Sequence, residues 1–277
     1  MLCKKADTKI IFNNNYIFQP KLDGTRVIYI DGNLINRRGR NIKQRYPEFK
    51  EFQIKNNSIL DGEVVVYNER GLPDFSLLQS REQTSNKFKI EFLSNKHPAT
   101  YVVFDCLKFE GKEIINEPLE YRLECLKKAI TEGNQLQLIF STENGLKLWN
   151  KAKELGIEGI MAKRKGSKYY PGKRVIACLK IKNVNTIDCI ILGYTMGEGK
   201  RKETFGALLI GIYNKKGDLI SLGKVGTGWT DQGLIDLKKL VCEVEYLEMT
   251  ENKELRAPSF KSLRFDKEPR DCIYEFN

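Results

Sequence analysis

The segment Gln19-Pro20-Lys21-Leu22-Asp23-Gly24-Thr25-Arg26 decides how the rest of the chain is interpreted. It puts a lysine within a few residues of a carboxylate, a glycine and an arginine, shortly before a strand predicted at residues 27–30. The glycine allows close approach of another backbone. A lysine beside other cations in a partly desolvated cleft becomes a nucleophile because its pKa is depressed. A surface Lys–Asp pair at a turn explains this segment alone equally well.

Later segments supply the charges that such a nucleophile needs. Asp61-Gly62-Glu63 opens one predicted strand, Phe104-Asp105 closes another, and Glu158 leads into a third at residues 160–162. In Leu179-Lys180-Ile181-Lys182 both lysines project from the same face of a strand. A K-x-K pair alone is more often an exposed strand face. Together with carboxylates suited to a divalent cation, however, these lysines favour phosphoryl or nucleotidyl transfer.

Short strands and a few helices alternate along residues 1–183. Asp31-Gly32 is a hairpin signal between two short apolar runs. This mixture predicts an α+β domain with largely antiparallel sheets. The expected strands are residues 27–30, 34–35, 61–67, 100–105, 160–162 and 177–181, and the expected helices are residues 118–133 and 142–155.

The pattern changes after Lys182, where Asn183-Val184-Asn185 has the composition of a short linker. We therefore expect two domains, residues 1–183 and residues 184–277. The second is predicted to hold strands at residues 186–194, 205–213 and 219–225, a Gly- and Lys-rich loop at 196–204 and a helix at 231–240. About five short strands with one helix predict a small Greek-key barrel such as an OB-fold.

Composition excludes several classes of protein. The chain of 277 residues is 41% hydrophobic, which is enough for a buried core and too apolar for disorder. No apolar run approaches the roughly 18 residues of a membrane span, and the N-terminal residues show no secretory signal. The seven cysteines are odd in number and contain no C-x-x-C pair, which argues against a disulfide framework or a cysteine zinc site and favours a reducing cytosol. The chain has a single histidine, His97, which argues against a Ser-His-Asp triad.

All of the excess positive charge lies in residues 1–183. The chain holds 47 basic and 36 acidic residues, a net charge of +11. Residues 184–277 contain 14 basic and 15 acidic residues, which leaves 33 basic and 21 acidic residues in the first part. A basic surface kept for solubility is one explanation. The other is a polyanion partner such as nucleic acid, bound through its phosphates.

In their order, these motifs resemble those of the covalent nucleotidyltransferases, and in their details those of ATP-dependent DNA ligases. The resemblance runs from about Phe18 to Tyr274 and includes Arg264-Phe265-Asp266-Lys267, a pattern of the family's C-terminal OB domain. It implies an adenylyltransferase domain at residues 1–183, an OB-fold domain at 184–277, and ATP with Mg²⁺ or Mn²⁺ as cofactors. Residues 73–79, 169–174 and 223–228 are similar to the ligase module of prokaryotic end-joining ligases.

The resemblance also implies a role for each matching residue. Lys21 would attack the α-phosphate of ATP and carry AMP as a phosphoramidate. Glu63 and Glu158 would hold the metal, with Asp23 nearby, and Phe104 would stack on adenine. Gln19 would contact adenine, at a position where the family often has an acid, and ribose or phosphate would be contacted by Glu63, Arg26 and Arg37. The charge of the α-phosphate would be neutralised by Lys163, Arg174, Lys180 and Lys182. The triphosphate would be covered by Arg264, Asp266 and Lys267. Cys178 stands where the family usually has an aromatic residue.

The implied activity is the sealing of 5′-phosphate/3′-hydroxyl nicks in duplex DNA through lysyl-AMP. An RNA ligase or mRNA-capping guanylyltransferase shares the lysine motif, and a non-catalytic nucleic-acid-binding module would keep only the basic cleft; intact Lys21, Glu63, Glu158, Lys180 and Lys182 argue against the latter. Only 20 residues precede Lys21, which disfavours a NAD-dependent ligase. The end-joining branch implies double-strand break repair with a Ku-type end-binding protein and a separate repair polymerase. We expect the protein to be a monomer that lies in the prokaryotic cytoplasm, at the nucleoid, and does not contact a membrane.

Overall fold

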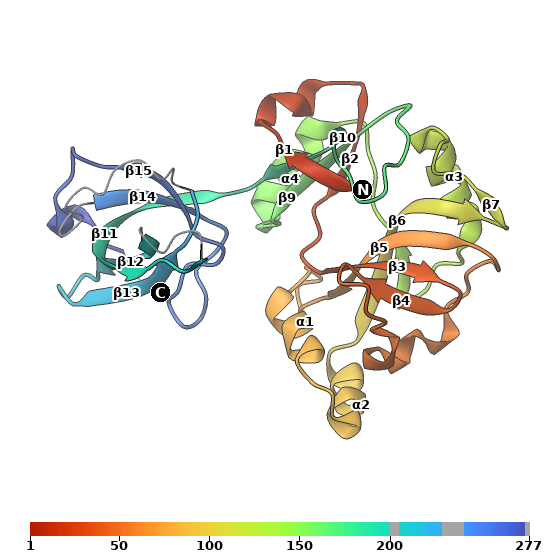
Figure 1. The fold of residues 1–277 in the computed structure, drawn as a ribbon, viewed down its shortest axis with the longest axis horizontal. Coiled ribbons are helices and arrows are strands. Elements are labelled where there is room, and N and C mark those ends of the chain that lie inside the picture. Colours follow the sequence, from red (N-terminus) through yellow and green to blue (C-terminus); the bar gives the residue numbers. More distant parts are fainter. Residues whose placement is uncertain (200–204, 229–240, 275–277) are drawn as a thin grey trace. The chain divides into compact units, whose positions relative to one another are not determined.

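The computed structural model describes residues 1–199, 205–228 and 241–274, which divide into two compact units (Figure 1). The first unit is Met1–Asn183 and the second is Val184–Asn277. The first is a mixed α+β structure with two sheets, and the second is built on one sheet. The helix expected at residues 231–240 and part of the loop expected at 196–204 lie outside the described residues.

The first sheet of the first unit carries the segments on both sides of the predicted nucleophile. Its strand order is β1-β10-β9-β2, with β1 and β10 parallel and the other pairs antiparallel. Helix α4 packs on it through Leu148, Trp149 and Ala152 against Phe18 and Ile160. The strands are β1 (Leu2–Lys5), β2 (Tyr16–Pro20), β9 (Gly159–Arg164) and β10 (Arg174–Lys182); α4 is Gly145–Leu155, and a 3₁₀ helix covers Thr8–Phe12.

The strands of the second sheet lie between β2 and β9 in the sequence. Their order is β4-β3-β5-β6-β7, and β8 pairs parallel to β6. Its core packs Leu60, Val64 and Tyr101 against Leu126 of helix α3. The strands are β3 (Thr25–Ile30), β4 (Asn33–Asn36), β5 (Ile59–Val66), β6 (Ala99–Phe109), β7 (Lys112–Glu113) and β8 (Leu136–Leu138). The helices are α1 (Phe75–Glu82), α2 (Lys87–Lys96) and α3 (Leu119–Ala129), with 3₁₀ turns at Lys43–Arg45 and Pro47–Glu51.

The second unit holds a five-stranded antiparallel sheet with the order β13-β12-β11-β14-β15. Ile210, Leu222 and Val244 are fully buried in its core. The strands are β11 (Asn185–Met196), β12 (Phe205–Tyr213), β13 (Leu219–Val225), β14 (Val241–Tyr246) and β15 (Ser259–Leu263), and a 3₁₀ turn covers Pro269–Asp271.

Most of the predicted elements are confirmed, with shifted ends. Asp31 and Gly32 form the hairpin turn with positive φ values of 47° and 76°. Helix α4 starts three residues later than predicted, because Thr142 exchanges two backbone hydrogen bonds with Phe18 instead. Strands β1, β2, β7, β8, β14 and β15 and helices α1 and α2 were not predicted. Strands β1, β7 and β8 are short, and in α2 the apolar residues Phe88, Ile90 and Phe92 alternate as they do in a strand.

The cysteine pattern argued against disulfides and favoured reduced cysteines, and this expectation is wrong for two of them. Cys3 of β1 and Cys178 of β10 form a disulfide across a sequence separation of 175 residues. The parallel pairing of β1 with β10 brings their Cα atoms to 4.6 Å, a proximity that sequence spacing does not reveal. The other five cysteines are free and buried.

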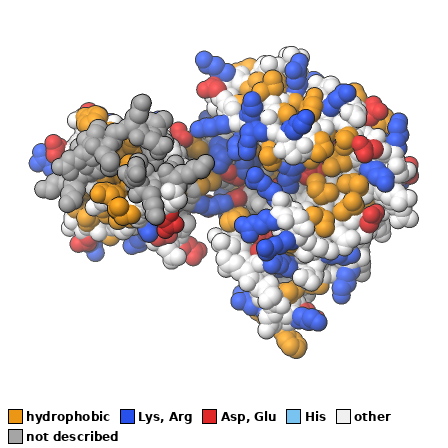
Figure 2. All heavy atoms as spheres, in the orientation of Figure 1, with side chains coloured by type: hydrophobic (Ala, Val, Ile, Leu, Met, Phe, Trp, Pro, Cys, Tyr) orange, Lys and Arg blue, Asp and Glu red, His pale blue; other side chains and the backbone are white. Residues whose placement is uncertain are grey.

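On the surface of the first unit, Lys and Arg side chains outnumber acidic ones over the face seen in Figure 2. This agrees with the excess of basic residues in residues 1–183. Among the described residues, no helix is long and apolar enough to cross a membrane.

Candidate active site

Lys21 follows β2 directly, and its position depends on Gly24. The backbone nitrogen of Lys21 donates to the carbonyl of Gly159 at 2.9 Å. A Cβ atom at Gly24 would lie 2.3 Å from the Val64 carbonyl oxygen and 2.8 Å from the Glu63 side chain. Glycine is therefore required where the chain approaches β5 just before β3 pairs with it, and both Lys21 and Glu63 line the same cavity.

Glu158 joins Lys21 to Lys182. One carboxylate oxygen accepts a hydrogen bond from Lys21 Nζ, and the other lies 3.1 Å from Lys182 Nζ. The adjoining Gly159 has φ 140°, and a Cβ there would lie 2.0 Å from the Ile181 carbonyl oxygen, so glycine is needed for β9 to approach β10 this closely. Burial acts to raise the pKa of Glu158, but the charges and hydrogen bonds of the two lysines outweigh it and lower that pKa. The carboxylate is thus ionised and shared between two cations.

Lys180 and Arg174 extend this cluster of cations along β10. Burial and then the charges of Lys182 and Lys21 lower the pKa of Lys180. Arg174, at the start of the strand, is exposed and donates to the Cys3 carbonyl at 2.6 Å. The predicted face of two lysines on one strand is therefore present beside Lys21.

A cavity of about 150 Å³ opens next to Lys21. The side chain of Phe104 lines it, with Lys163 Nζ 4.4 Å from the ring centroid and donating to the Phe104 carbonyl at 2.8 Å. Gln19 is almost fully buried and donates to Ser141 Oγ at 3.0 Å. Six of the predicted site residues line the cavity: Gln19, Lys21, Arg26, Glu63, Phe104 and Lys163.

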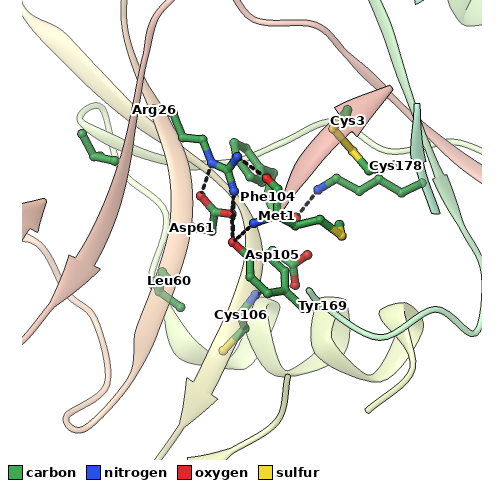
Figure 3. Close-up of polar contacts among 12 residues, drawn as sticks. Met1, Cys3, Arg26, Leu60, Asp61, Phe104, Asp105, Cys106, Tyr169 and Cys178 are labelled. Atoms are coloured by element: carbon green, nitrogen blue, oxygen red, sulfur yellow. Dashed lines mark hydrogen bonds and ion pairs between the residues drawn. A yellow bond between two sulfur atoms is a disulfide. The ribbon is translucent and has the colours of Figure 1, made fainter. Parts of the chain in front are cut away.

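Two Arg–Asp pairs support this cavity, and of their four residues the sequence assigned a role to Arg26 alone. Arg26 donates hydrogen bonds to both carboxylate oxygens of Asp61. Asp61 also accepts a hydrogen bond from the Tyr169 hydroxyl at 2.9 Å (Figure 3). Asp61 faces Asp105 across β5 and β6, and Arg122 binds Asp105 through two hydrogen bonds of 2.7 and 3.1 Å. Asp61, Asp105 and Arg122 are at most 1% exposed. The signal available was their position beside motif residues, since Asp61 precedes Gly62-Glu63 and Asp105 follows Phe104.

Burial shifts two titratable groups at the cavity toward their neutral forms. It raises the pKa of Glu63 to about 8, although the charge of Lys21 opposes the shift. It lowers the pKa of Lys163 to about 8, against the attraction of Asp105 and Asp61. Such displaced values are typical of a site that binds or reacts with a charged ligand.

The carboxylates present fit a hard divalent cation better than a soft one. Among the described residues, no group of three or more His, Cys, Asp and Glu side chains could hold a metal alone. Oxygen ligands from one or two carboxylates, completed by substrate phosphates, are the usual way in which Mg²⁺ binds. Glu158 and Glu63 fit that arrangement. Asp23 is partly buried but is not one of the residues that line the cavity.

The other nine predicted site residues are not among those that line the cavity: Asp23, Arg37, Glu158, Arg174, Lys180, Lys182, Arg264, Asp266 and Lys267. Arg37 is exposed in the turn after β4. Arg264, Asp266 and Lys267 belong to the second unit, where they form a cluster with Asp188 of β11. The sequence gave no signal for Asp188, because 76 residues separate it from Arg264.

Comparison with known proteins identifies the family. The model of the family described as ATP dependent DNA ligase domain matches residues 1–182. The chain belongs to this family. The match covers the unit that holds Lys21, Glu158 and the cavity, so the resemblance to ATP-dependent DNA ligases is confirmed at the level of the family.

Relatives in the family are longer than this chain. A DNA ligase of Thermococcus onnurineus (strain NA1) is 32% identical over 94% of the chain and 54% of its own length. The multifunctional non-homologous end joining protein LigD of Mycolicibacterium smegmatis is 30% identical over 94% of the chain and 37% of its own length. The chain thus spans about half of the first relative and less of the second.

Solved ligase structures share the fold. The ligase domain of M. tuberculosis LigD aligns with a TM-score of 0.56 at 26% identity, over 99% of this chain and 97% of that one. A mycobacterial DNA ligase D complexed with ATP and MES aligns over the same shares with a TM-score of 0.57 at 26% identity. A Lig E DNA ligase, 20% identical, covers 95% of this chain and 98% of its own with a TM-score of 0.68, which shows likeness of fold alone.

Proposed function

We propose that this chain is an ATP-dependent DNA ligase that seals 5′-phosphate/3′-hydroxyl nicks in duplex DNA through a lysyl-AMP intermediate on Lys21. One observation carries the proposal. The Lys21 amine lies beside Glu158 and Lys182 at the edge of a cavity lined by an aromatic ring, Phe104, and a carboxylate, Glu63. Family membership and the likeness to ligase domains support the same activity.

In the first proposed step, the Lys21 amine loses its proton and bonds to the α-phosphorus of ATP as pyrophosphate leaves. The AMP then passes to the 5′-phosphate at the nick, and finally the 3′-hydroxyl attacks that phosphorus and releases AMP. Each step is a displacement at phosphorus, so catalysis consists of positioning and charge neutralisation. Lys180 and Lys182 supply the neutralising charge, together with Lys163 in the cavity wall and Arg174 at the start of β10, while Phe104 offers a face on which adenine stacks.

The remaining cavity residues are proposed to bind the nucleotide. Arg26, fixed by Asp61, faces ribose or phosphate, and Gln19 lies at the adenine end. Arg37, exposed in the turn after β4, is proposed to contact ribose or phosphate. A divalent cation held by Glu63 and Glu158, with Asp23 nearby, would neutralise phosphate charge when bound. Magnesium is the cation that these oxygen ligands suit best, and manganese is the alternative.

We propose that the second unit is an OB-fold domain whose Arg264, Asp266 and Lys267 contact the triphosphate during the first step. Its five-stranded antiparallel sheet supports that assignment. The duplex DNA substrate is held through its phosphates by the basic first unit. End joining at double-strand breaks, with a Ku-type end-binding protein and a separate polymerase as partners, is the pathway that the LigD relative suggests.

The test is to incubate the full chain with ATP labelled at the α-phosphate and then to add nicked DNA. The label is expected to become covalently attached to the protein and to appear in free AMP as the nick is sealed. Lys21→Ala should abolish labelling, while Lys55→Ala, at an exposed ion pair with Glu110 outside the cavity, should label like the wild type. Undiminished labelling of Lys21→Ala would refute the proposal. Labelling by GTP, or sealing of nicked RNA in preference to DNA, would redirect it to a related nucleotidyltransferase.

A further inference from the structure

In the second unit, one carboxylate holds two cations together. Asp188 Oδ1 accepts from Arg264 Nη1 at 2.9 Å, and its Oδ2 accepts from Lys267 Nζ. The remaining face of the Arg264 guanidinium binds Asp266 through two hydrogen bonds of 2.9 and 2.7 Å. Two cations and two carboxylates therefore cancel, and the cluster has no net charge to offer a phosphate.

The position of Asp188 in the sheet is electrostatically costly. On β11 it lies directly opposite Glu243 of β14, and like charges at such cross-strand positions repel. Glu243 has its own partner, Lys261, at 2.9 Å. Asp188 therefore depends on Arg264 and Lys267 for its compensation. A sheet shaped by stability alone would favour a neutral residue at position 188.

The two carboxylates of the cluster differ in what they hold. Asp266 is 65% exposed and pairs with Arg264, two residues away. Asp188 is 17% exposed and ties both cations to a strand of the core sheet. It is thus the residue that fixes where Arg264 and Lys267 lie while no phosphate is bound.

We propose that Asp188 is a positioning residue for nucleotide transfer, a counter-ion that keeps Arg264 and Lys267 paired and that the phosphates of ATP must displace. The inference rests on the proposed function, because it assumes that these two cations contact the triphosphate. Competition has a direct consequence. Replacing Asp188 by a neutral residue frees Lys267 and one nitrogen of Arg264, so the nucleotide and pyrophosphate bind more tightly.

The experiment measures formation of the covalent AMP adduct by full-length Asp188→Asn as a function of ATP concentration. Partly exposed ion pairs contribute modestly, so we expect the KM for ATP to fall about threefold to fivefold, and the inhibition constant for pyrophosphate to fall by a similar factor. The maximal rate should not rise. A damaged fold cannot produce tighter binding, which separates this role from a structural one. Asp188→Ser carries the same prediction if Asp188→Asn does not fold.

Glu248→Gln is the matched control, since Glu248 forms a comparable ion pair with Arg256 in the same unit, at 2.9 Å. It should leave both constants unchanged. A KM for Asp188→Asn that is unchanged or raised would overturn the inference. The proposed function is tested separately by Arg264→Ala and Lys267→Ala. If both label at the wild-type rate, the proposed role of that segment fails; if both lose labelling while Asp188→Asn behaves like Glu248→Gln, only the inference fails.

Discussion

Glu158 in the first unit and Asp188 in the second have the same local design but different surroundings. Each carboxylate gives one oxygen to each of two cations, Lys21 and Lys182 in one case, Arg264 and Lys267 in the other. The Glu158 side chain is 9% exposed and pairs with Lys21, which lines a cavity beside the fully buried Arg122–Asp105 ion pair. The Asp188 cluster includes Asp266, which is largely exposed.

This difference suggests two kinds of charge cluster. Burial fixes the first before any nucleotide arrives, as covalent chemistry at Lys21 requires. Partly exposed ion pairs contribute modestly and are screened by salt, so the second cluster can exchange its carboxylate for phosphate and return. The three predictions below test that division, from the largest expected effect to the smallest.

Glu158→Gln tests the first cluster most severely. It removes the charge shared by Lys21 and Lys182 while keeping the size of the side chain, so the lysines repel each other and Lys21 loses its orientation. We expect formation of the AMP adduct to slow by about 10² to 10³-fold in single-turnover labelling. Asp188→Asn, in contrast, should keep a maximal rate close to that of the wild type. Equal losses in the two variants would contradict the division.

Asp105→Asn tests the buried support behind the cavity. It leaves the fully buried guanidinium of Arg122 without a counter-charge, and breaking such a pair typically costs about 3–5 kcal/mol of unfolding free energy. Urea unfolding of the full chain measures this loss. Glu154→Gln, at the exposed Lys151–Glu154 pair, is the control and should change stability by less than about 0.5 kcal/mol.

Glu63 makes stability depend on pH. Its pKa rises from an ordinary 4.5 to about 8 on folding, so the folded chain binds a proton that the unfolded chain has lost between these values. Stability from this group is complete below pH 4.5 and is lost as the pH rises through 8. Without nucleotide or metal, the unfolding free energy of the wild type should fall by about 2 kcal/mol more than that of Glu63→Gln between pH 5.5 and 7.5. Parallel pH profiles for the two proteins would contradict this account.

The sequence predicted the residues around Lys21 because each sits beside a local signal. Gly24, Gly62 and Gly159 mark close backbone approaches, and the K-x-K spacing fixes a shared strand face. The K-x-K spacing alone did not place Lys182 at the site; the ordered motifs and their resemblance to a known family led to the expectation that Lys21, Glu63 and Lys182 act together.

The supporting contacts were not predictable because they depend on long-range register. Nothing in the pattern of α3 separates the buried Arg122 from its exposed neighbours Lys127 and Lys128. The pairing of β1 with β10 decides the Cys3–Cys178 disulfide, and the end of β15 decides which side chains reach Asp188. Local motifs therefore identify the chemistry, whereas tertiary pairing chooses the partners that hold it in place.

The central claim is that the amine of Lys21 becomes bonded to phosphorus. The direct measurement is intact mass spectrometry of the chain after treatment with ATP and Mg²⁺, followed by peptide mapping. The account predicts one added AMP, located on the peptide that contains Lys21 and removed by pyrophosphate. An unmodified mass, or an AMP on any other lysine, would contradict it.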